Sequence, residues 1–268
     1  MFIILNNKHI KMDDNYVINR GLKEWKINPK FFNSVLQEKC RNFNINPKTI
    51  KFYSQQDEDK YIIQKILKKP VKDGIFLEAG AMDGVTYNNT KTLEDFFGFT
   101  GILIEPVPSM YDKLIKNRPN CKNFNCTISD IENEKVKLIG KNACAGIVDF
   151  INNGSKNQLS RTDINNPYEV KNFSLTEVIK KSGFEYIDIM SIDVEGGELS
   201  FLKSFDFKIP VFCIIIEAHS DEQDKNKIFG DYLVSKNFTF MERQRGNEIW
   251  MNKNYHRLEY FNLINNSP

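Results

Sequence analysis

Two acidic residues of this chain stand where apolar runs end, a position from which a carboxylate can face a ligand. The first run ends at Glu78 and leads into a turn that contains Gly80 and Gly84, and the next run ends at Glu105. Each run is typical of a buried strand, and glycines four apart let the backbone turn tightly before a helix. At the carboxyl end of a parallel strand, such a turn is where open α/β sheets bind nucleotide-like ligands.

The position of Glu105 narrows the kind of ligand. In nucleotide-binding α/β folds, an acid at the end of the second strand accepts hydrogen bonds from both ribose hydroxyls. The dinucleotide fingerprint Gly-x-Gly-x-x-Gly is absent, because Met82 stands where a second glycine is needed. A ligand with a ribose but no pyrophosphate fits better, and S-adenosylmethionine is the common one. The alternative interpretation is an ordinary turn between a strand and a helix.

Later apolar runs also end in polar side chains. These are Ser129 and Asp130, then Asp193 and Glu195, then Glu217 and His219. If the strands are parallel, all of these residues lie at one edge of the sheet. Asp130 could accept a hydrogen bond from an adenine amine, or it could only cap a turn.

A series of short motifs extends over roughly residues 50 to 250. They are Tyr53–Asp59, Phe76–Gly84, Asn89-Thr90, Gly101–Pro106, Ile128–Asp130, Ser174-Leu175 and Ile192–Glu198. In this order they resemble the FkbM family of S-adenosylmethionine-dependent methyltransferases. The resemblance implies a Rossmann-like class I methyltransferase fold, transfer of a methyl group to oxygen, and a sugar, a glycan or a glycosylated small molecule as acceptor.

The resemblance also implies which residues bind the cofactor. They are Gln56, Asp57, Glu78, Gly80, Ala81, Asp83, Gly84, Glu105, Pro106, Ser129, Asp130 and Asp193. Gln56 and Asp57 belong to a segment that covers the cofactor in family members, although capping of a helix would also explain an acidic residue there. Met82 and Asn88 depart from the residues common in the family, so the shape of the methionine pocket stays open.

Methyl transfer to a sugar hydroxyl requires a group that removes a proton or raises the nucleophilicity of the oxygen. His219 is the leading candidate for a catalytic base, because the other two histidines lie near the chain ends. Asp193 with Glu195 or Glu217 is the other option, either as a carboxylate base or as a site for Mg²⁺, which prefers oxygen ligands. Each of these side chains could instead have a structural role.

The elements that position these residues alternate between strands and helices. Strands are predicted to end near residues 77, 104, 128, 192 and 216, with helices over 86–97, 108–117, 175–181 and 224–235 and a hairpin over 238–251. This pattern predicts an α/β fold with a mostly parallel seven-stranded sheet and a terminal antiparallel hairpin. A β excursion is expected over 136–150, followed by an irregular loop over 151–168 that is suited to acceptor recognition.

The predicted domain organisation has three parts. Residues 1–50 form an amino-terminal arm with a helix near 29–40, residues 51–254 form the methyltransferase domain, and residues 255–268 form a surface tail. Three roles stay open for the arm, namely a lid, a contact in a homodimer, or packing alone.

Composition excludes several classes of partner. With 37 basic and 35 acidic residues, the chain has no electrostatic footprint for nucleic acid or for an anionic membrane surface. Five cysteines without a Cys-x-x-Cys pair argue against a disulfide framework and a zinc site, so a cytoplasmic location is expected. No apolar segment is long enough to span a membrane.

Two other functions remain as alternatives to methyl transfer. One is a catalytically silent protein of the same fold that binds the cofactor or acts as a scaffold. The other is an NAD-type oxidoreductase, for which Glu105 would suit the ribose but the pyrophosphate-binding glycines are missing.

Overall fold

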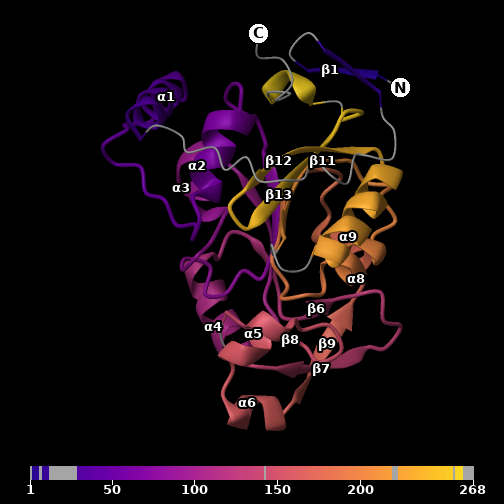
Figure 1. Cartoon of the computed structure of the whole chain (residues 1–268). Helices are drawn as coiled ribbons and strands as arrows, with labels where there is room; N and C mark the ends of the chain where they lie inside the picture. Colours follow the sequence, from indigo (N-terminus) through magenta and orange to yellow (C-terminus); the bar gives the residue numbers. More distant parts are fainter. Residues whose placement is uncertain are drawn as a thin grey trace.

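The structure is a computed structural model that describes residues 2–5, 8–11, 29–141, 143–218, 223–255 and 257–261, with side chains from Ser34 onward except that of Leu258. At its centre is a seven-stranded sheet in the order β12-β13-β11-β10-β3-β4-β5 (Figure 1). Its strands are β3 (Ile75–Ala79), β4 (Thr100–Ile104), β5 (Lys122–Phe124), β10 (Ile187–Ile192), β11 (Val211–Glu217), β12 (Phe238–Gln244) and β13 (Asn247–Asn252).

The directions and connections of the strands determine which strand ends meet at one edge of the sheet. Strands β5, β4, β3, β10 and β11 are parallel, whereas β13 pairs antiparallel with both β11 and β12. The chain runs from β3 outward to β4 on one side and later returns to β10 on the other, so the order of the strands reverses beside β3. The sequence predicted this mostly parallel, Rossmann-like sheet and its terminal hairpin, and the structure confirms both.

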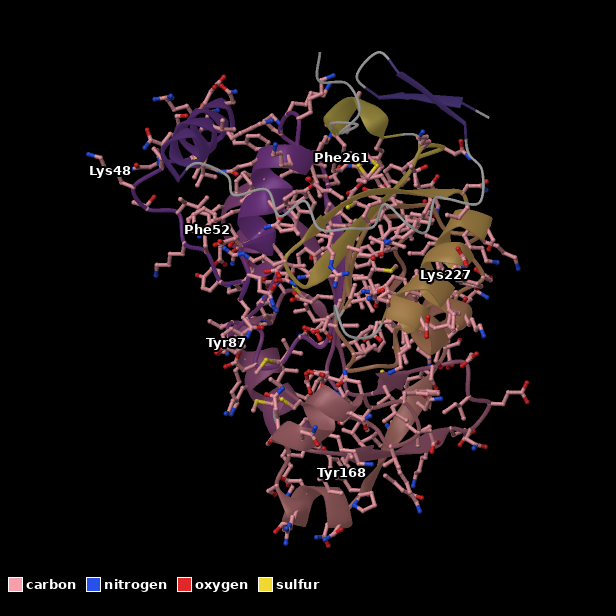
Figure 2. The ribbon with its side chains drawn as sticks, in the orientation of Figure 1. Lys48, Phe52, Tyr87, Tyr168, Lys227 and Phe261 are labelled. Carbon is pink, nitrogen blue, oxygen red and sulfur yellow. The ribbon has the colours of Figure 1, made fainter. Side chains whose placement is uncertain are left out.

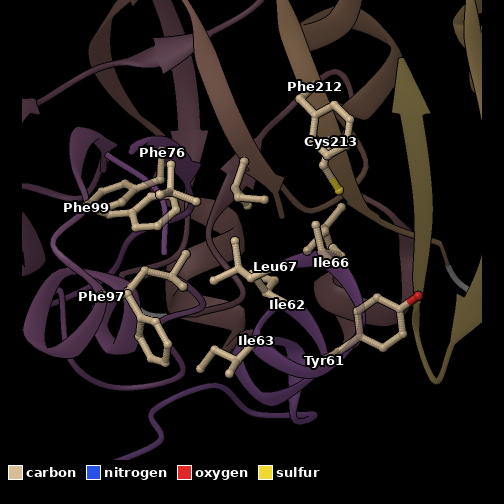
Figure 3. Packing of buried hydrophobic residues seen from close by; sticks show 14 of the residues in the cluster. Tyr61, Ile62, Ile63, Ile66, Leu67, Phe76, Phe97, Phe99, Phe212 and Cys213 are labelled. Carbon is tan, nitrogen blue, oxygen red and sulfur yellow. The ribbon is translucent and has the colours of Figure 1, made fainter. Parts of the chain in front are cut away.

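Helices cover both faces of the main sheet. They are α1 (Pro29–Asn42), α2 (Glu58–Tyr61), α3 (Lys91–Phe97), α4 (Pro108–Asn117), α7 (Leu175–Ser182), α8 (Glu198–Lys203) and α9 (Gln223–Ser235), with a π-helical turn η2 (Ile62–Ile66) after α2. Successive strand residues point to opposite faces, so Phe76 packs with η2 and α3 while Leu77 packs with α7 to α9. Figure 3 shows the first of these two cores, in which Ile62 and Ile66 pack beside Leu67.

A second, smaller sheet lies at the bottom of the molecule in Figure 1. Its order is β6-β9-β7-β8, and it is accompanied by α5 (Asn153–Gln158) and α6 (Arg161–Asn165). Its strands are β6 (Thr127–Ile128), β7 (Lys135–Ile139), β8 (Gly146–Ile147) and β9 (Tyr168–Phe173). The expected β excursion is therefore confirmed.

Two expectations about this region were wrong. The single strand predicted to end near residue 128 is divided, because β5 stays in the main sheet while β6 pairs with β9. The predicted irregular loop over 151–168 contains α5 and α6, whose first amides are capped by the side chains of Asn152 and Ser160.

Helix α1 and the carboxyl end of the described chain pack against the domain. Leu36 and Cys40 of α1 are buried, and Lys39 Nζ donates to the carbonyl of Leu67 at 2.6 Å. The expected surface tail was wrong for residues 255–261, because Tyr255 is buried and the buried ring of Phe261 lies 4.3 Å from that of Phe212. The remaining terminal elements are β1 (Phe2–Leu5), which pairs antiparallel with β2 (Lys8–Lys11), and η3 (Leu258–Tyr260). The boundaries and the role of the arm stay predictions.

The described helices were compared with the length and hydropathy of membrane-spanning helices. Within the described part of the chain, no helix combines the length and the apolar character that crossing a bilayer requires.

Candidate active site

A pocket of about 530 Å³ lies at the carboxyl ends of the central strands. Gly80 follows β3, Glu105 follows β4, Asp193 follows β10, and Glu217 is the last residue of β11; all four line the pocket. The pocket therefore lies where the strand order reverses, which is the place where open α/β sheets bind their ligands.

The turn after β3 depends on Gly80. Its φ is +83°, and a Cβ at this position would overlap the carbonyl oxygen of Asp193. The amides of Gly80 and Ala81 both donate to the carbonyl of Ile104 at 3.1 Å, which ties the turn to the end of β4. Only a glycine fits here, and its small size brings the turn and the end of β10 together at the pocket.

Glu105 is a buried carboxylate in the pocket wall, held by two backbone amides. Oε2 accepts from the amide of Met82 and Oε1 from the amide of Val107, both at 2.8 Å. Burial raises the pKa of Glu105 to about 7, although the two amides oppose that shift. The amides fix the orientation of the carboxylate, and two of its lone pairs remain for a ligand in the pocket.

A pair of carboxyl groups lies at the same edge of the sheet. The side chains of Asp193 and Glu217 hydrogen-bond to each other, and Asp193 lines the pocket with an exposed side chain. The surrounding protein raises the pKa of Asp193 well above its ordinary value, and the nearby charges of Glu217 and Glu195 raise it further. The pair therefore holds a proton more readily than an isolated carboxylate does.

The wall opposite the main sheet comes from the second sheet and from α5. Ser155 on α5 hydrogen-bonds through its hydroxyl to Glu195, and the amide of Asn152 donates to the carbonyl of Glu195 at 3.3 Å. Glu195 has a φ of +58°, which is uncommon for a residue with a Cβ. These contacts join the inserted segment to the turn after β10, and Ser155 and Glu195 both line the pocket.

The segment before α2 closes another side of the pocket. Gln56 lines the pocket, and its Oε1 accepts from the amide of Gly246 in the turn between β12 and β13 at 3.0 Å. Asp57 does not line the pocket but pairs with Lys60 and Arg245. Asp57 occupies the residue before α2, while the hydroxyl of Ser54 donates to the carboxylate of Asp59 and accepts from the amide of Asp59 at 3.3 Å.

Unlike Glu105, Glu78 lies outside the pocket lining. Its carboxylate is buried and accepts from the amides of Asn89 and Thr90, at 2.7 and 3.3 Å, and from the hydroxyl of Thr90 at 2.6 Å. Burial raises the pKa of Glu78, which these donors counteract. Glu78 is not among the residues that line the pocket. It positions the start of α3, and the helix predicted from residue 86 begins only at Lys91.

The other residues implicated by the sequence lie in several places. Pro106 lines the pocket; Ala81, Asp83, Gly84, Ser129 and Asp130 do not. Asp83 accepts from the amides of Val85 and Thr86 within its own turn, and although burial alone would raise its pKa, these bonds bring it below the usual value. His219 lies outside the described residues, so its role as a base stays a prediction.

Hydrogen-bond partners explain where Ser129 and Asp130 lie. The hydroxyl of Ser129 donates to Asn172 at 2.9 Å, and the carboxylate of Asp130 accepts from Ser200 on α8. Both residues follow β6, which belongs to the second sheet, and Asp130 is exposed. Asp130 is therefore not among the residues that could contact an adenine ring in this pocket.

Several pocket residues were not identified from the sequence. They include Gln55, Met82, Tyr87, Cys126, Ile128, Leu138, Cys144, Ser155 and Gln158. Tyr87 is 51% exposed and lies at the surface near the pocket (Figure 2). Its place directly after the glycine turn was the available signal, but the residue was assigned to a helix. Nothing local in the sequence marks the residues of the second sheet, because they reach the pocket through long-range pairing.

The geometry gives no support to the expected magnesium site. Among the described residues, no group of three or more histidine, cysteine, aspartate or glutamate side chains is arranged to hold a metal ion. Asp193 and Glu217 hydrogen-bond to each other instead.

Comparison with a family model gives one match, and comparison with curated proteins gives none. The model described as the methyltransferase FkbM domain matches residues 78–249, a range that contains the whole edge of the sheet where the pocket lies. No curated protein matches the chain.

Solved structures with a similar backbone include the following three proteins. One is described as a Methanococcus jannaschii fibrillarin pre-rRNA processing protein, with 15% identity, coverage of 72% of this chain and 73% of the other, and a TM-score of 0.40. A TehB-like SAM-dependent methyltransferase from Corynebacterium glutamicum has 11% identity, coverage of 84% and 100%, and a TM-score of 0.39. Aeropyrum pernix fibrillarin, in complex with natively bound S-adenosyl-L-methionine, has 13% identity, coverage of 69% and 69%, and a TM-score of 0.38.

Proposed function

This chain belongs to the FkbM family of methyltransferases, and we propose that it transfers a methyl group from S-adenosylmethionine to a hydroxyl of a sugar or glycan. Its fold is the Rossmann-like class I methyltransferase fold, with the pocket at the reversal of strand order. We assign one group of pocket residues to the cofactor and another group to the acceptor.

One observation carries the cofactor assignment, namely the orientation of Glu105 beside the glycine turn. Its carboxylate is fixed by two amides at the end of β4 and can accept from both hydroxyls of a ribose. Gly80 lets the backbone come close to the amino-acid portion of the cofactor. Ile104, Ile128 and Leu138 in the same pocket provide an apolar surface for the purine ring.

The acceptor assignment rests on polar side chains from α5 and from the segment before α2. Gln56, Ser155 and Gln158 place amide and hydroxyl groups in the pocket, close in sequence or space to the carboxylates of Asp193 and Glu195. Such groups can both donate to and accept from a polyol, which is how a protein orients a sugar hydroxyl.

The chemistry requires an oxygen nucleophile in line with the methyl–sulfur bond and a group that takes its proton. Asp193, which hydrogen-bonds to Glu217, is suited to accept that proton, because the raised pKa of Asp193 makes it a stronger base than an ordinary carboxylate. When bound, S-adenosylmethionine would supply the methyl group for the acceptor oxygen, and Asp193 and Glu217 would take the proton of the hydroxyl. His219 remains the competing candidate.

Calorimetric titration tests the cofactor assignment. S-adenosylmethionine should bind and NAD should not, and Glu105→Ala should weaken binding at least 100-fold. Glu185→Ala is the matched control, because Glu185 is exposed and precedes β10 at the opposite end of the sheet. Binding of NAD, or unchanged affinity in Glu105→Ala, would contradict the proposal.

Activity measurements test the base. Asp193→Asn and His219→Gln should both be assayed with a hydroxylated acceptor over a range of pH. If the carboxylate pair is the base, Asp193→Asn loses the acidic limb of the pH–rate profile and His219→Gln keeps it. If a panel of sugars and glycans is never methylated although the cofactor binds, the protein is a silent member of the fold.

A further inference from the structure

A buried carboxylate behind the pocket joins two segments that are far apart in the chain. Glu58 on α2 is 5% exposed and does not line the pocket. Its Oε2 accepts from the backbone amide of Gln56 at 2.9 Å, and its Oε1 accepts from the side-chain amide of Asn247 at 2.6 Å. Gln56 precedes α2, whereas Asn247 is the first residue of β13.

The first partner of Glu58 belongs to the pocket wall. Gln56 lines the pocket, and its side-chain Oε1 accepts from the amide of Gly246 at 3.0 Å. This bond fixes which end of the side-chain amide is the acceptor. Within the described part of the chain, Nε2 of Gln56 has no hydrogen-bond partner, so its two donors remain for a ligand.

The second partner leads to the end of β11. Asn247 lies directly opposite Glu217 in the antiparallel pairing of β13 with β11. The carbonyl of Gly246, the residue before Asn247, accepts from the amide of Ala218 at 2.7 Å. The turn between β12 and β13 therefore contacts the chain on both sides of the pocket carboxylate Glu217 and the side chain of Gln56 as well.

This turn depends on contacts from outside the hairpin. It consists of Arg245 and Gly246, and Arg245 has a φ of +52°, which is uncommon for a residue with a Cβ. Arg245 also pairs with Asp57 at 2.9 Å. Burial raises the pKa of Glu58, so a charge at this position is costly. Only a carboxylate, however, accepts from two donors through two separate oxygens, which is what the contacts of Glu58 require.

We propose that Glu58 is a positioning residue for the methyl transfer proposed above. By holding Gln56 and Asn247 together, it fixes the turn between β12 and β13, and the turn sets Gln56 and Glu217 at the pocket. The inference rests on the proposed function, because it concerns the same pocket. The contacts of Glu58 do not include the glycine turn or Glu105, so the cofactor should bind equally well without them.

An exchange of donor and acceptor tests this role. Glu58→Gln keeps the size of the side chain but leaves one of its two donors without an acceptor. In the double variant Glu58→Gln/Asn247→Asp, the new amide donates to the new carboxylate and still accepts from the backbone of Gln56. Both contacts are thereby restored. Glu185→Gln, which removes an exposed carboxylate before β10, is the control.

Amide hydrogen exchange, measured by NMR, follows the turn directly and requires no acceptor. The amides of Gly246 and Ala218 should exchange at least tenfold faster in Glu58→Gln, relative to the amide of Met190 in the central strand β10. The comparison with Met190 cancels a general loss of stability. The double variant should restore the slow exchange, and Glu185→Gln should keep it. If Glu58→Gln leaves the relative exchange unchanged, Glu58 does not fix the turn and the inference is wrong.

Activity separates positioning from support of the fold. In Glu58→Gln, calorimetry should give a Kd for S-adenosylmethionine within about twofold of the wild type. Transfer of tritium from methyl-labelled S-adenosylmethionine to the panel of sugars and glycans should show kcat/KM lowered at least tenfold. The double variant should recover most of this loss, which a change in stability alone would not explain.

The outcomes distinguish this inference from the proposed function. If the wild type methylates a member of the panel and Glu58→Gln does so equally well, the positioning role is wrong and the methyl transfer stands. A loss that the double variant does not recover also overturns the positioning role. If the wild type methylates no member of the panel, the proposed function fails and this inference fails with it.

Discussion

The two halves of the pocket are built by different means. On the cofactor side, Gly80 and Glu105 stand at the ends of neighbouring parallel strands, and backbone hydrogen bonds fix both. On the other side, the wall comes from the second sheet and α5, which meet the main sheet through contacts such as that of Ser155 with Glu195. The first half follows from the sheet itself, whereas the second depends on a segment inserted between β5 and β10.

The largest expected loss of stability comes from Arg118, which is buried behind the glycine turn of the cofactor half. Arg118 is fully buried, pairs with Glu94, and donates to the carbonyl of Gly84 at 3.2 Å and to Asn88 at 2.8 Å. Arg118→Met should lower the free energy of unfolding by about 3–5 kcal/mol, because it leaves a carboxylate and a carbonyl without their buried partner. Denaturation in urea measures this loss. Arg161→Met, on the exposed face of α6, is the control and should change stability by less than about 0.5 kcal/mol.

The next effect comes from the glycine turn. Gly80→Ala should lower the free energy of unfolding by about 2–4 kcal/mol and abolish measurable cofactor binding, because the new Cβ overlaps the carbonyl of Asp193. Gly98→Ala is a matched control, since Gly98 also has positive φ but a Cβ added there would meet no packed neighbour within 4 Å. It should cost only about 1–2 kcal/mol and leave binding intact. Equal losses in the two variants would remove the steric explanation.

A smaller effect should follow pH. Because the pKa of Glu105 is raised to about 7, the carboxylate is mostly protonated near pH 5.5 and mostly ionised near pH 7.5. Cofactor affinity should rise roughly tenfold over that interval, since the ionised form accepts from both ribose hydroxyls.

Stability of the free protein should move in the opposite direction. The folded state holds the Glu105 proton to higher pH than the unfolded state, so this contribution to stability is lost as pH rises from about 4.5 to 7. Glu105→Gln should flatten both dependences. Affinity that falls with pH in the wild type would contradict this role for Glu105.

The smallest effect is expected on the acceptor side. Ser155→Ala removes the hydroxyl that binds Glu195 and should cost about 1–2 kcal/mol of stability. The KM for the acceptor should rise several-fold while the Kd for the cofactor stays unchanged. Ser160→Ala, which removes a serine hydroxyl that caps α6 without touching the pocket, should leave the KM unchanged. If Ser155→Ala weakens cofactor binding equally, the two halves are not separable.

Much of the cofactor half could be predicted from the sequence, because its signals are local. The turn at Gly80, the acid at Glu105 and the position of Asp193 each follow an apolar run directly, and parallel pairing then brings them to one edge. The acceptor half could not be predicted in this way. Leu138 reaches the pocket on β7, which pairs with β9 far along the chain, and Ser155 reaches it on α5 beside that second sheet.

Glu78 and Glu105 show where the sequence stops being informative. Both acids follow apolar runs, and periodicity places them on adjacent strands. By itself, the sequence determined the alternation of strands and helices, the glycine turn and the acidic strand ends, because these depend on backbone geometry and on local burial. The tertiary structure decided which acid faces the ligand: the amides of Asn89 and Thr90 bind Glu78, whereas those of Met82 and Val107 hold Glu105 toward the pocket. A carboxylate takes its role from the donors around it, and the fold supplies those donors from distant parts of the chain.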